Sequence, residues 1–204
     1  MEKGTGARKR RPYRMERRQE VAAKTRQRII DVAVRLHTSI GPSLTTISEI
    51  ADQAGVSRLT VYRHFESGDD LFEACRQHWS AQHASPDLSA VASIPTFELR
   101  VRLGLGGLYA WYDANGGDLY PIYRDEAVLP QPSRAAMAAI DEAVVGVLLG
   151  DADFETEAVG RRVRATLGHV VRLLTVLSLI SAGLTAKEAS ELAADWVLRA
   201  ADLG

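Results

Sequence analysis

The chain is poor in cysteine, in aromatic residues and in long apolar runs. It contains one cysteine and 6 % aromatic residues among 204 residues. A single cysteine excludes an internal disulfide, which fits the reducing cytosol. The longest apolar run, Leu173 to Ile180, is far shorter than the roughly 20 residues of a membrane-spanning helix. Because no apolar segment follows the basic N-terminus either, we expect a cytoplasmic protein with no signal peptide and no membrane partner.

Strand signals and catalytic motifs are also missing. No run alternates polar and apolar residues, and neither G-x-S-x-G nor H-E-x-x-H occurs. Gly104-x-Gly106-Gly107 follows no strand, so it is not a phosphate loop. Cys75 and His78 lie three residues apart, but no further ligand pair accompanies them. The sequence therefore predicts an all-α protein that is not an enzyme and has no cofactor, no catalytic residues and no metal site.

Positive charge is concentrated at the N-terminus. The net charge is only −1, but residues 1–84 contain 15 basic and 10 acidic residues, and the first 28 residues contain 11 basic and 3 acidic ones. We expect residues 1–15 to form a basic, disordered arm. Such an arm on a near-neutral protein favours one localised contact with a polyanion. A solvated tail that binds nothing is an equally good interpretation of the arm taken alone.

Helical patterns cover most of the remaining chain. Apolar residues recur with helical spacing, Gly41-Pro42 ends the first segment, and Thr46/Glu49 has the spacing of a capping box. Residues 84–95 contain two prolines and are expected to form a loop. The sequence predicts about nine helices, at residues 16–39, 46–54, 57–64, 67–83, 96–115, 121–129, 133–149, 155–182 and 186–201.

The segment 46–65 carries the clearest functional signal. Two short helical segments meet at Gly55, where a tight turn tolerates a positive φ. Val56, Val61 and Phe65 are apolar anchors that would pack the second segment across the first, as in a helix-turn-helix. The opposite face carries side chains suited to phosphates and base edges: Ser57, Arg58, Leu59, Thr60, Tyr62, Arg63 and His64. A generic three-helix module with an exposed third helix would show the same polar face.

The same residues resemble the DNA-binding domain of the TetR family of transcription regulators. The resemblance covers roughly residues 24–75 and rests on Thr45-Thr46-Ile47, Ile50-Ala51, Ala54-Gly55-Val56-Ser57, Val61-Tyr62-Arg63-His64-Phe65 and Asp70-Leu71-Phe72. It implies a DNA-binding domain over residues 16–66 and a ligand-binding, dimer-forming domain over residues 67–204.

The resemblance also implies roles for single residues. Thr46 would contact phosphate, Ser48 would face the DNA, residues 57–60 would approach base edges, and Tyr62 and His64 would hold the backbone. One departure is Gly68, where the family usually has a lysine. The basic side chains of the arm could compensate from the adjacent groove: Arg8, Lys9, Arg10, Arg11 and Arg14.

The C-terminal two-thirds offer weaker signals. Three glycines between residues 104 and 107 cost about 1 kcal/mol each in a helix, so the helix bends there or the space is used. We expect a mostly apolar ligand pocket lined by Trp79, Phe97, Leu105, Leu108, Tyr109, Tyr112 and Tyr123. Plain core aromatics are nearly as good an interpretation. Arg124-Asp125-Glu126 is most simply a solvated, charged face.

The last two predicted helices, 155–182 and 186–201, are apolar on more than one face. We expect them to form a homodimer interface, although they could also simply cap the monomer core. The family resemblance implies a repressor that binds double-stranded operator DNA and is released by a small-molecule effector, here a small, largely apolar ligand. The alternative is a ligand-independent or architectural DNA-binding protein.

Overall fold

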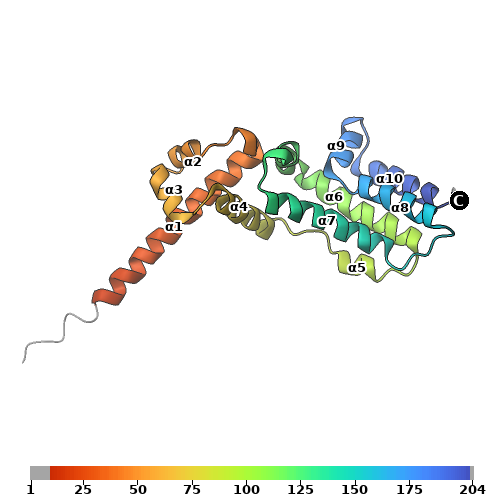
Figure 1. The fold of residues 1–204 in the computed structure, drawn as a ribbon, viewed down its shortest axis with the longest axis horizontal. Helices are drawn as coiled ribbons and strands as arrows, with labels where there is room; N and C mark the ends of the chain where they lie inside the picture. Colours follow the sequence, from red (N-terminus) through yellow and green to blue (C-terminus); the bar gives the residue numbers. More distant parts are fainter. Residues whose placement is uncertain (1–9, 203–204) are drawn as a thin grey trace, which may run out of the picture.

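The structure is a computed structural model that describes residues 10–202, with side chains described over residues 15–201. Within this range every regular element is helical, which confirms the all-α prediction (Figure 1). The elements are α1 (Arg10–Ser39), η1 (Pro42–Leu44), α2 (Ile47–Gln53), α3 (Arg58–His64), α4 (Gly68–Gln82), α5 (Leu88–Ala92), α6 (Phe97–Arg124), η2 (Glu126–Val128), α7 (Gln131–Leu149), α8 (Glu157–Val170), α9 (Leu173–Ser181) and α10 (Ala186–Asp202).

The first four helices build a small head with its own core. α1 is long, and α2, α3 and α4 pack around its C-terminal half (Figure 1). Ile29 and Ala33 on α1 meet Ile50 on α2, Val61 on α3 and Leu71 on α4 in one buried cluster. Each of these residues belongs to the apolar face of its own helix. The apolar pattern of the sequence therefore sets the core of the head.

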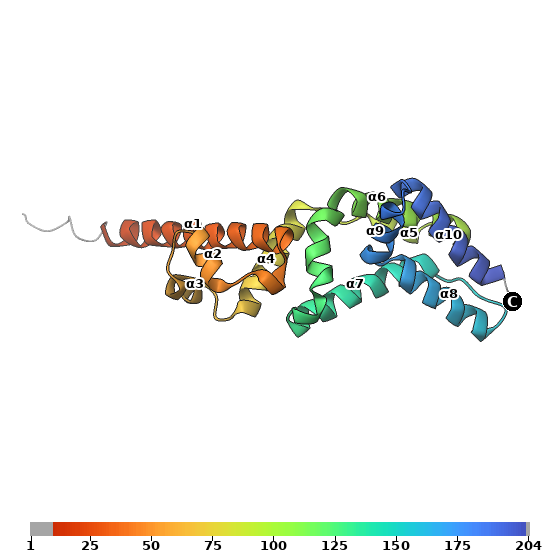
Figure 2. The same cartoon turned by 90° about the horizontal axis from the view of Figure 1, so that it is seen from above.

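The remaining helices form a larger body around α6. α6 contacts α7, α9 and α10, and α8 packs between α7 and α10 (Figure 2). Val101, Leu105 and Tyr109 on α6 are completely buried against Val163 and Leu167 on α8 in a second core. Figure 2 shows the head and the body as two lobes along one axis, with α1 extending past the head.

α6 differs from the prediction because it is one helix where the sequence indicated two. We expected a helix over 96–115, a stop at Gly116-Gly117 and a new helix at Pro121, but α6 continues through all three positions. A Cβ at Gly116 would lie 3.0 Å from Leu177 Cδ2, so this glycine allows close packing against α9 and does not end the helix. The predicted loop 84–95 also contains the short helix α5.

The predicted helix 155–182 is divided into α8 and α9. Arg172 adopts an extended conformation between them, and the Thr175 hydroxyl donates a hydrogen bond of 2.8 Å to the freed carbonyl of His169. Among the described helices, none is individually long and apolar enough to cross a membrane, and α8 and α9 reach that length only as a pair bent by 68°.

The first helix begins earlier than predicted. α1 starts at Arg10, so residues 10–15, which we expected in a disordered arm, belong to a helix. Residues 1–9, with Arg8 and Lys9, lie outside the described part of the chain, so the prediction for them is not addressed. No apolar face marks the start of this helix, since residues 15–23 are all exposed.

A polar joint connects the head to the body where α1 and α6 both end. The Arg124 guanidinium donates a hydrogen bond of 2.8 Å to the carbonyl of Ile40, and the Asp125 carboxylate accepts bonds of 3.0 and 2.6 Å from the backbone and hydroxyl of Ser43. Gly41 lies against both side chains with φ +96°. Arg124 is exposed, as expected of a solvated charged face, although it also binds the head, whereas the expectation is wrong for Asp125, whose side chain is only 8 % exposed.

Candidate nucleic-acid interface

The turn between α2 and α3 is built as the sequence predicts. The Thr46 hydroxyl accepts a hydrogen bond from the backbone of Glu49 and begins α2. Gly55 has φ +63°, and the backbone N–H of Val56 donates to the carbonyl of Ala51. This positive φ closes the helix and redirects the chain within two residues. The second hydrogen bond of the predicted capping box, from the backbone of Thr46 to the Glu49 side chain, is not formed. The Glu49 carboxylate accepts a hydrogen bond from the Gln53 side chain instead.

α3 begins at a side-chain cap formed by two of the predicted DNA-facing residues. The Ser57 hydroxyl accepts a hydrogen bond of 3.1 Å from the backbone of Thr60 and lies 2.9 Å from the Thr60 hydroxyl. Both hydroxyls are therefore engaged within the protein, which fixes their positions at the start of the helix.

The two faces of α3 have opposite environments. Val61 and Phe65 are buried in the core of the head, at 1 % and 3 % exposure. Leu59 is 78 % exposed and Tyr62 is 45 % exposed, and Arg58 and Arg63 are exposed beside them. The solvent-facing side of α3 thus carries an apolar, an aromatic and two basic side chains, which are opposite to the anchors in the core.

His64 lies at the edge of this face and is only partly exposed. Partial burial lowers its pKa, and the nearby Arg63 and Arg26 cations lower it further. The side chain is therefore neutral near pH 7 and presents hydrogen-bonding groups without a charge. Its exposure is lower than that of Arg58 and Leu59.

Further exposed groups continue the surface onto α2 and α1. Thr46 and Ser48 are both exposed at the start of α2, as the sequence predicted. Leu44, which the sequence analysis did not single out, is 63 % exposed just before them. Arg17 and Arg18 are exposed on the part of α1 that projects past the head (Figure 1). The basic composition of residues 1–28 predicted a basic N-terminal extension, but no feature of the sequence predicted that this extension is helical.

The residues predicted to line a ligand pocket all belong to the core of the body or pack against it, but none of the cavities described is lined by them together. Leu105, Leu108, Tyr109 and Tyr112 fill the core of the body. The Tyr109 hydroxyl donates a hydrogen bond of 3.0 Å to the carbonyl of Val170. These four side chains thus show the packing of plain core residues.

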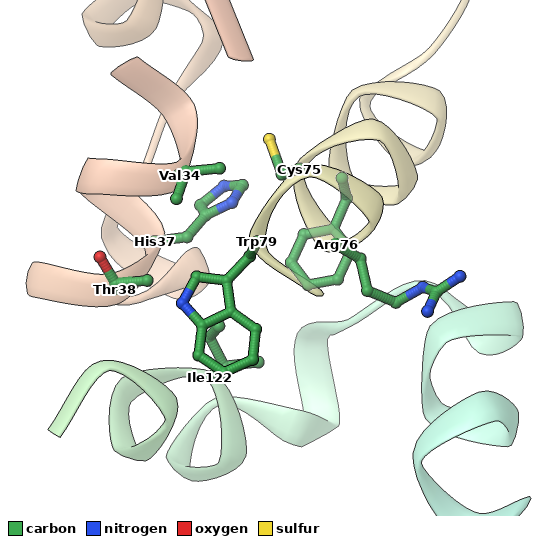
Figure 3. Close-up of a pocket in the computed structure, with 8 residues that line it drawn as sticks. Val34, His37, Thr38, Cys75, Arg76, Trp79 and Ile122 are labelled. Atoms are coloured by element: carbon green, nitrogen blue, oxygen red, sulfur yellow. The ribbon is translucent and has the colours of Figure 1, made fainter. Parts of the chain in front are cut away.

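The other three predicted residues are partly buried and pack against the outside of that core. Phe97 meets the ring of Phe154 edge to face at 5.5 Å. Tyr123 borders a cavity of about 70 Å³ together with Asp141 and Arg172, where burial raises the pKa of Asp141. Trp79 borders a separate cavity of about 30 Å³ between α1, α4 and α6 (Figure 3). The prediction of one shared pocket therefore has no counterpart among the cavities described. Tyr123 and Trp79 instead border two separate small cavities.

Comparison with known proteins agrees with the geometry of the head. The model for "Bacterial regulatory proteins, tetR family" matches residues 29–75, from the middle of α1 to the middle of α4. The HTH-type transcriptional regulator AcrR of Shigella flexneri is 51 % identical over 51 residues, which are 25 % of this chain and 24 % of that protein.

A further relative and a solved structure extend the comparison. The probable acrEF/envCD operon repressor of Escherichia coli K12 is 34 % identical over 94 residues, 43 % of this chain and 41 % of that protein. These curated relatives are thus matched over less than half of their length. The transcriptional regulator FadR of Bacillus subtilis, solved in complex with stearoyl-CoA, has a TM-score of 0.54 at 16 % identity over 86 % of this chain and 97 % of that one.

The sequence match of the head and the structural likeness of the whole chain agree with each other. The matched segment contains the helix-turn-helix whose outer face is described above, and the solved structure shares the arrangement of head and body. Residues 29–75 are therefore similar to the TetR family of bacterial regulatory proteins, and the chain as a whole shares the fold of a solved transcriptional regulator.

Proposed function

We propose that this protein is a transcription regulator that binds double-stranded operator DNA through α3. The observation that carries the proposal is the division of α3 into a buried side, Val61 and Phe65, and a side held in solvent, Arg58, Leu59 and Tyr62. A short helix anchored in this way fits the major groove of B-DNA.

The proposed contacts follow from the chemistry of the exposed side chains. Arg58, in the first turn of α3, carries a guanidinium that can bond guanine O6 and N7 at once, and Leu59 offers an apolar contact to a thymine methyl group. Thr46 and Ser48 lie at the N-terminus of α2, where backbone N–H groups and hydroxyls favour a phosphate. Tyr62 reaches the DNA backbone from the next turn of α3.

A homodimer would supply the second recognition helix. Helix-turn-helix dimers read half-sites about 34–36 Å apart, one turn of the duplex. In support, α8 and α10 pack side by side, and α10 presents Leu192 and Trp196 at 37 % and 36 % exposure. The expected interface through the two C-terminal helices is thus restricted to α8 and α10, because α9 bends away from α8.

We further propose a repressor that a small, largely apolar effector releases. The stearoyl-CoA in the structure of FadR shows that a protein of this fold holds an apolar chain. An effector that binds the DNA-incompetent state more tightly by about 1–3 kcal/mol would weaken DNA binding about 5–150-fold. The joint of Arg124 and Asp125 with the head is a direct route for that coupling.

One observation favours a second candidate, a ligand-independent DNA-binding protein. Leu105, Leu108, Tyr109 and Tyr112 fill the interior of the body where an effector pocket was expected. A thermal-shift screen with apolar ligands, followed by binding to DNA, separates the two candidates. Stabilisation by a ligand that also lowers DNA affinity supports the effector-controlled repressor, and DNA binding that no ligand changes supports the second.

The experiment that tests DNA binding is a gel shift with DNA flanking the gene for this protein, repeated at several salt concentrations. We expect a sequence-specific complex of two chains per site, with log K falling linearly with log salt. Binding to this DNA no tighter than to a scrambled duplex would contradict the proposal. Light scattering of the free protein tests the dimer independently of DNA.

A further inference from the structure

The cavity at the junction of the head and the body contains two buried polar atoms without a partner. His37 Nδ1 on α1 and Trp79 Nε1 on α4 are inaccessible to solvent, and neither forms a hydrogen bond in the described structure. Both side chains line the same cavity, which Ile122 on α6 closes from the body side (Figure 3). A buried polar group without a partner costs about 1–3 kcal/mol, so two at one small space indicate a missing binding partner.

The surroundings of the two atoms are otherwise apolar. Phe72 stacks at a tilt on His37, with ring centroids 5.2 Å apart, and Cys75 is buried beside them. Trp79 is held on its other side by the parallel ring of His83 at 4.0 Å. Figure 3 shows the indole nitrogen of Trp79 turned toward α1 and away from α7. The two polar atoms are thus presented by rigid side chains from different helices.

The charges at the cavity exclude an ionic ligand. The only charged side chain in its lining, Arg76, is bound by Glu73 through two hydrogen bonds of 2.8 and 2.7 Å. Burial holds the pKa of His37 at about 4, so its ring is neutral near pH 7. An anion would therefore find no free cation, and a cation would find no free carboxylate.

Among the groups of a ligand, the hydrogen-bonding requirement favours a hydroxyl, which here takes the place that one water molecule could fill. The indole N–H of Trp79 can only donate, whereas Nδ1 of neutral His37 donates in one tautomer and accepts in the other. A hydroxyl oxygen can accept from Trp79 and still accept from or donate to His37, so it satisfies both atoms in either tautomer. A carbonyl oxygen satisfies both in only one tautomer.

The size of the cavity limits how much of a ligand enters it. A volume of about 30 Å³ suits one hydroxyl-bearing group and is well below that of an engineered cavity that encloses benzene. Thr38 and Arg76, at the rim, are partly exposed, so the apolar remainder of a ligand would lie at the opening.

We propose that this junction is a binding site for an uncharged alcohol, whose hydroxyl group joins His37 on α1 to Trp79 on α4. Occupancy fixes α1 against α4 and α6, and so sets the orientation of the head. The effect on DNA rests on the function proposed above, whereas binding of the alcohol does not.

The test uses the full-length protein and benzyl alcohol as the probe, followed by the ¹⁵N–¹H signal of the Trp79 indole and the ring signals of His37. Toluene, which lacks the hydroxyl, and benzoate, which is charged, are the matched compounds. We expect saturable shifts of both residues with benzyl alcohol and none of that size with the other two. An equal response to toluene, or no response of the Trp79 signal, overturns the proposal.

Three variants complete the test. His37→Phe and Trp79→Phe each remove one polar atom and keep an aromatic ring, and each should weaken benzyl alcohol binding by about fivefold or more, as expected for one lost hydrogen bond. Tyr120→Phe removes one polar atom from an exposed aromatic side chain on α6 outside the cavity lining and should leave binding unchanged. If the first two variants bind as tightly as the wild type, the site is wrong. A gel shift with and without benzyl alcohol then reports on DNA separately.

Discussion

The carboxylate of Asp125 accepts two hydrogen bonds from Ser43, a residue 82 positions earlier in the chain. This contact joins the end of α6 to the segment between α1 and α2, and Arg124 strengthens it by binding both Asp125 and the carbonyl of Ile40. Because the segment after α1 leads directly into the helix-turn-helix, this contact connects α6 to the head without involving α4.

Asp125→Asn is expected to lower the melting temperature at pH 7. Hydrogen bonds from Arg124 and Ser43 hold the pKa of Asp125 far below its usual range. The carboxylate therefore stabilises the fold above its unfolded pKa of about 3.9, and that stabilisation is lost as the pH falls toward the folded pKa.

Thermal unfolding of both proteins between pH 7 and pH 2 measures this effect, and the gap between their melting temperatures should close in acid. Asp113→Asn, at an exposed position on the same helix, is the control and should show little change. A gap that is constant at all pH values would show that the charge of Asp125 is not involved.

His37→Phe is expected to make the protein more resistant to acid. Burial holds the pKa of His37 at about 4, below its unfolded value of about 6.5, so the unfolded chain binds a proton first as the pH falls. The wild type should lose about 3 kcal/mol of stability between pH 7 and pH 4 from this residue, and the variant should not. Urea unfolding at pH 7, 5.5 and 4 measures the difference. Parallel losses in the two proteins would contradict the burial of His37.

Two glycines of α6 should respond in opposite directions to alanine. A Cβ at Gly104 would overlap Leu148 Cδ2 in the core, whereas a Cβ at Gly106 meets nothing within 4 Å. Gly104→Ala should destabilise the protein by roughly 1–3 kcal/mol through overpacking. Gly106→Ala should stabilise it by about 0.5–1 kcal/mol through helix propensity. Unfolding in urea measures both, and destabilisation by Gly106→Ala would reveal that a partner needs this position to be small.

Arg58→Ala is expected to weaken specific DNA binding by about 1–3 kcal/mol and to relax the preference for one base pair. The side chain is exposed, so the melting temperature should change little. Competition gel shifts with single-base variants of the operator measure the effect. Arg134→Ala removes an equal charge from an exposed position on α7 and should leave binding unchanged. Equal loss on every sequence would assign Arg58 to a phosphate.

Arg17→Ala combined with Arg18→Ala tests whether the projecting part of α1 reaches DNA. If both side chains contact phosphates, the slope of log K against log salt should fall by about 2, with specific and non-specific binding weakened alike. Removing residues 1–14 tests the preceding basic residues in the same way. An unchanged slope in both variants would mean that the basic N-terminus contributes no phosphate contact.

The head was predictable because its signals are local. The cap at Thr46, the turn at Gly55 and the cap at Ser57 each depend on residues within five positions, and the apolar anchors Val61 and Phe65 follow helical spacing. The exposed face of α3 follows directly from these features. The family resemblance lay in the same short segment, so sequence and structure agree most closely there.

The body was less predictable because a glycine can either end a helix or let another helix pack closely against it. Gly116 looked like a helix stop, but in the structure it lets α9 approach α6 closely. The apolar run from Leu173 to Ile180 suggested that the helix continues past Arg172, and it gave no sign of the bend there. Several aromatic residues of α6 were expected to line a pocket, but only packing decides whether such residues surround a cavity or fill it.

The sequence by itself determined the helical class, the helix-turn-helix and the side of α3 that faces solvent, since caps, turns and apolar periodicity act over a few residues. Only the tertiary structure brought Asp125 to Ser43 and placed His37 beside Trp79 without partners. Those pairs lie 82 and 42 positions apart, and no local preference encodes a meeting between side chains on separate helices. It arises from how the helices pack, which fixes the joint and the cavity between head and body together.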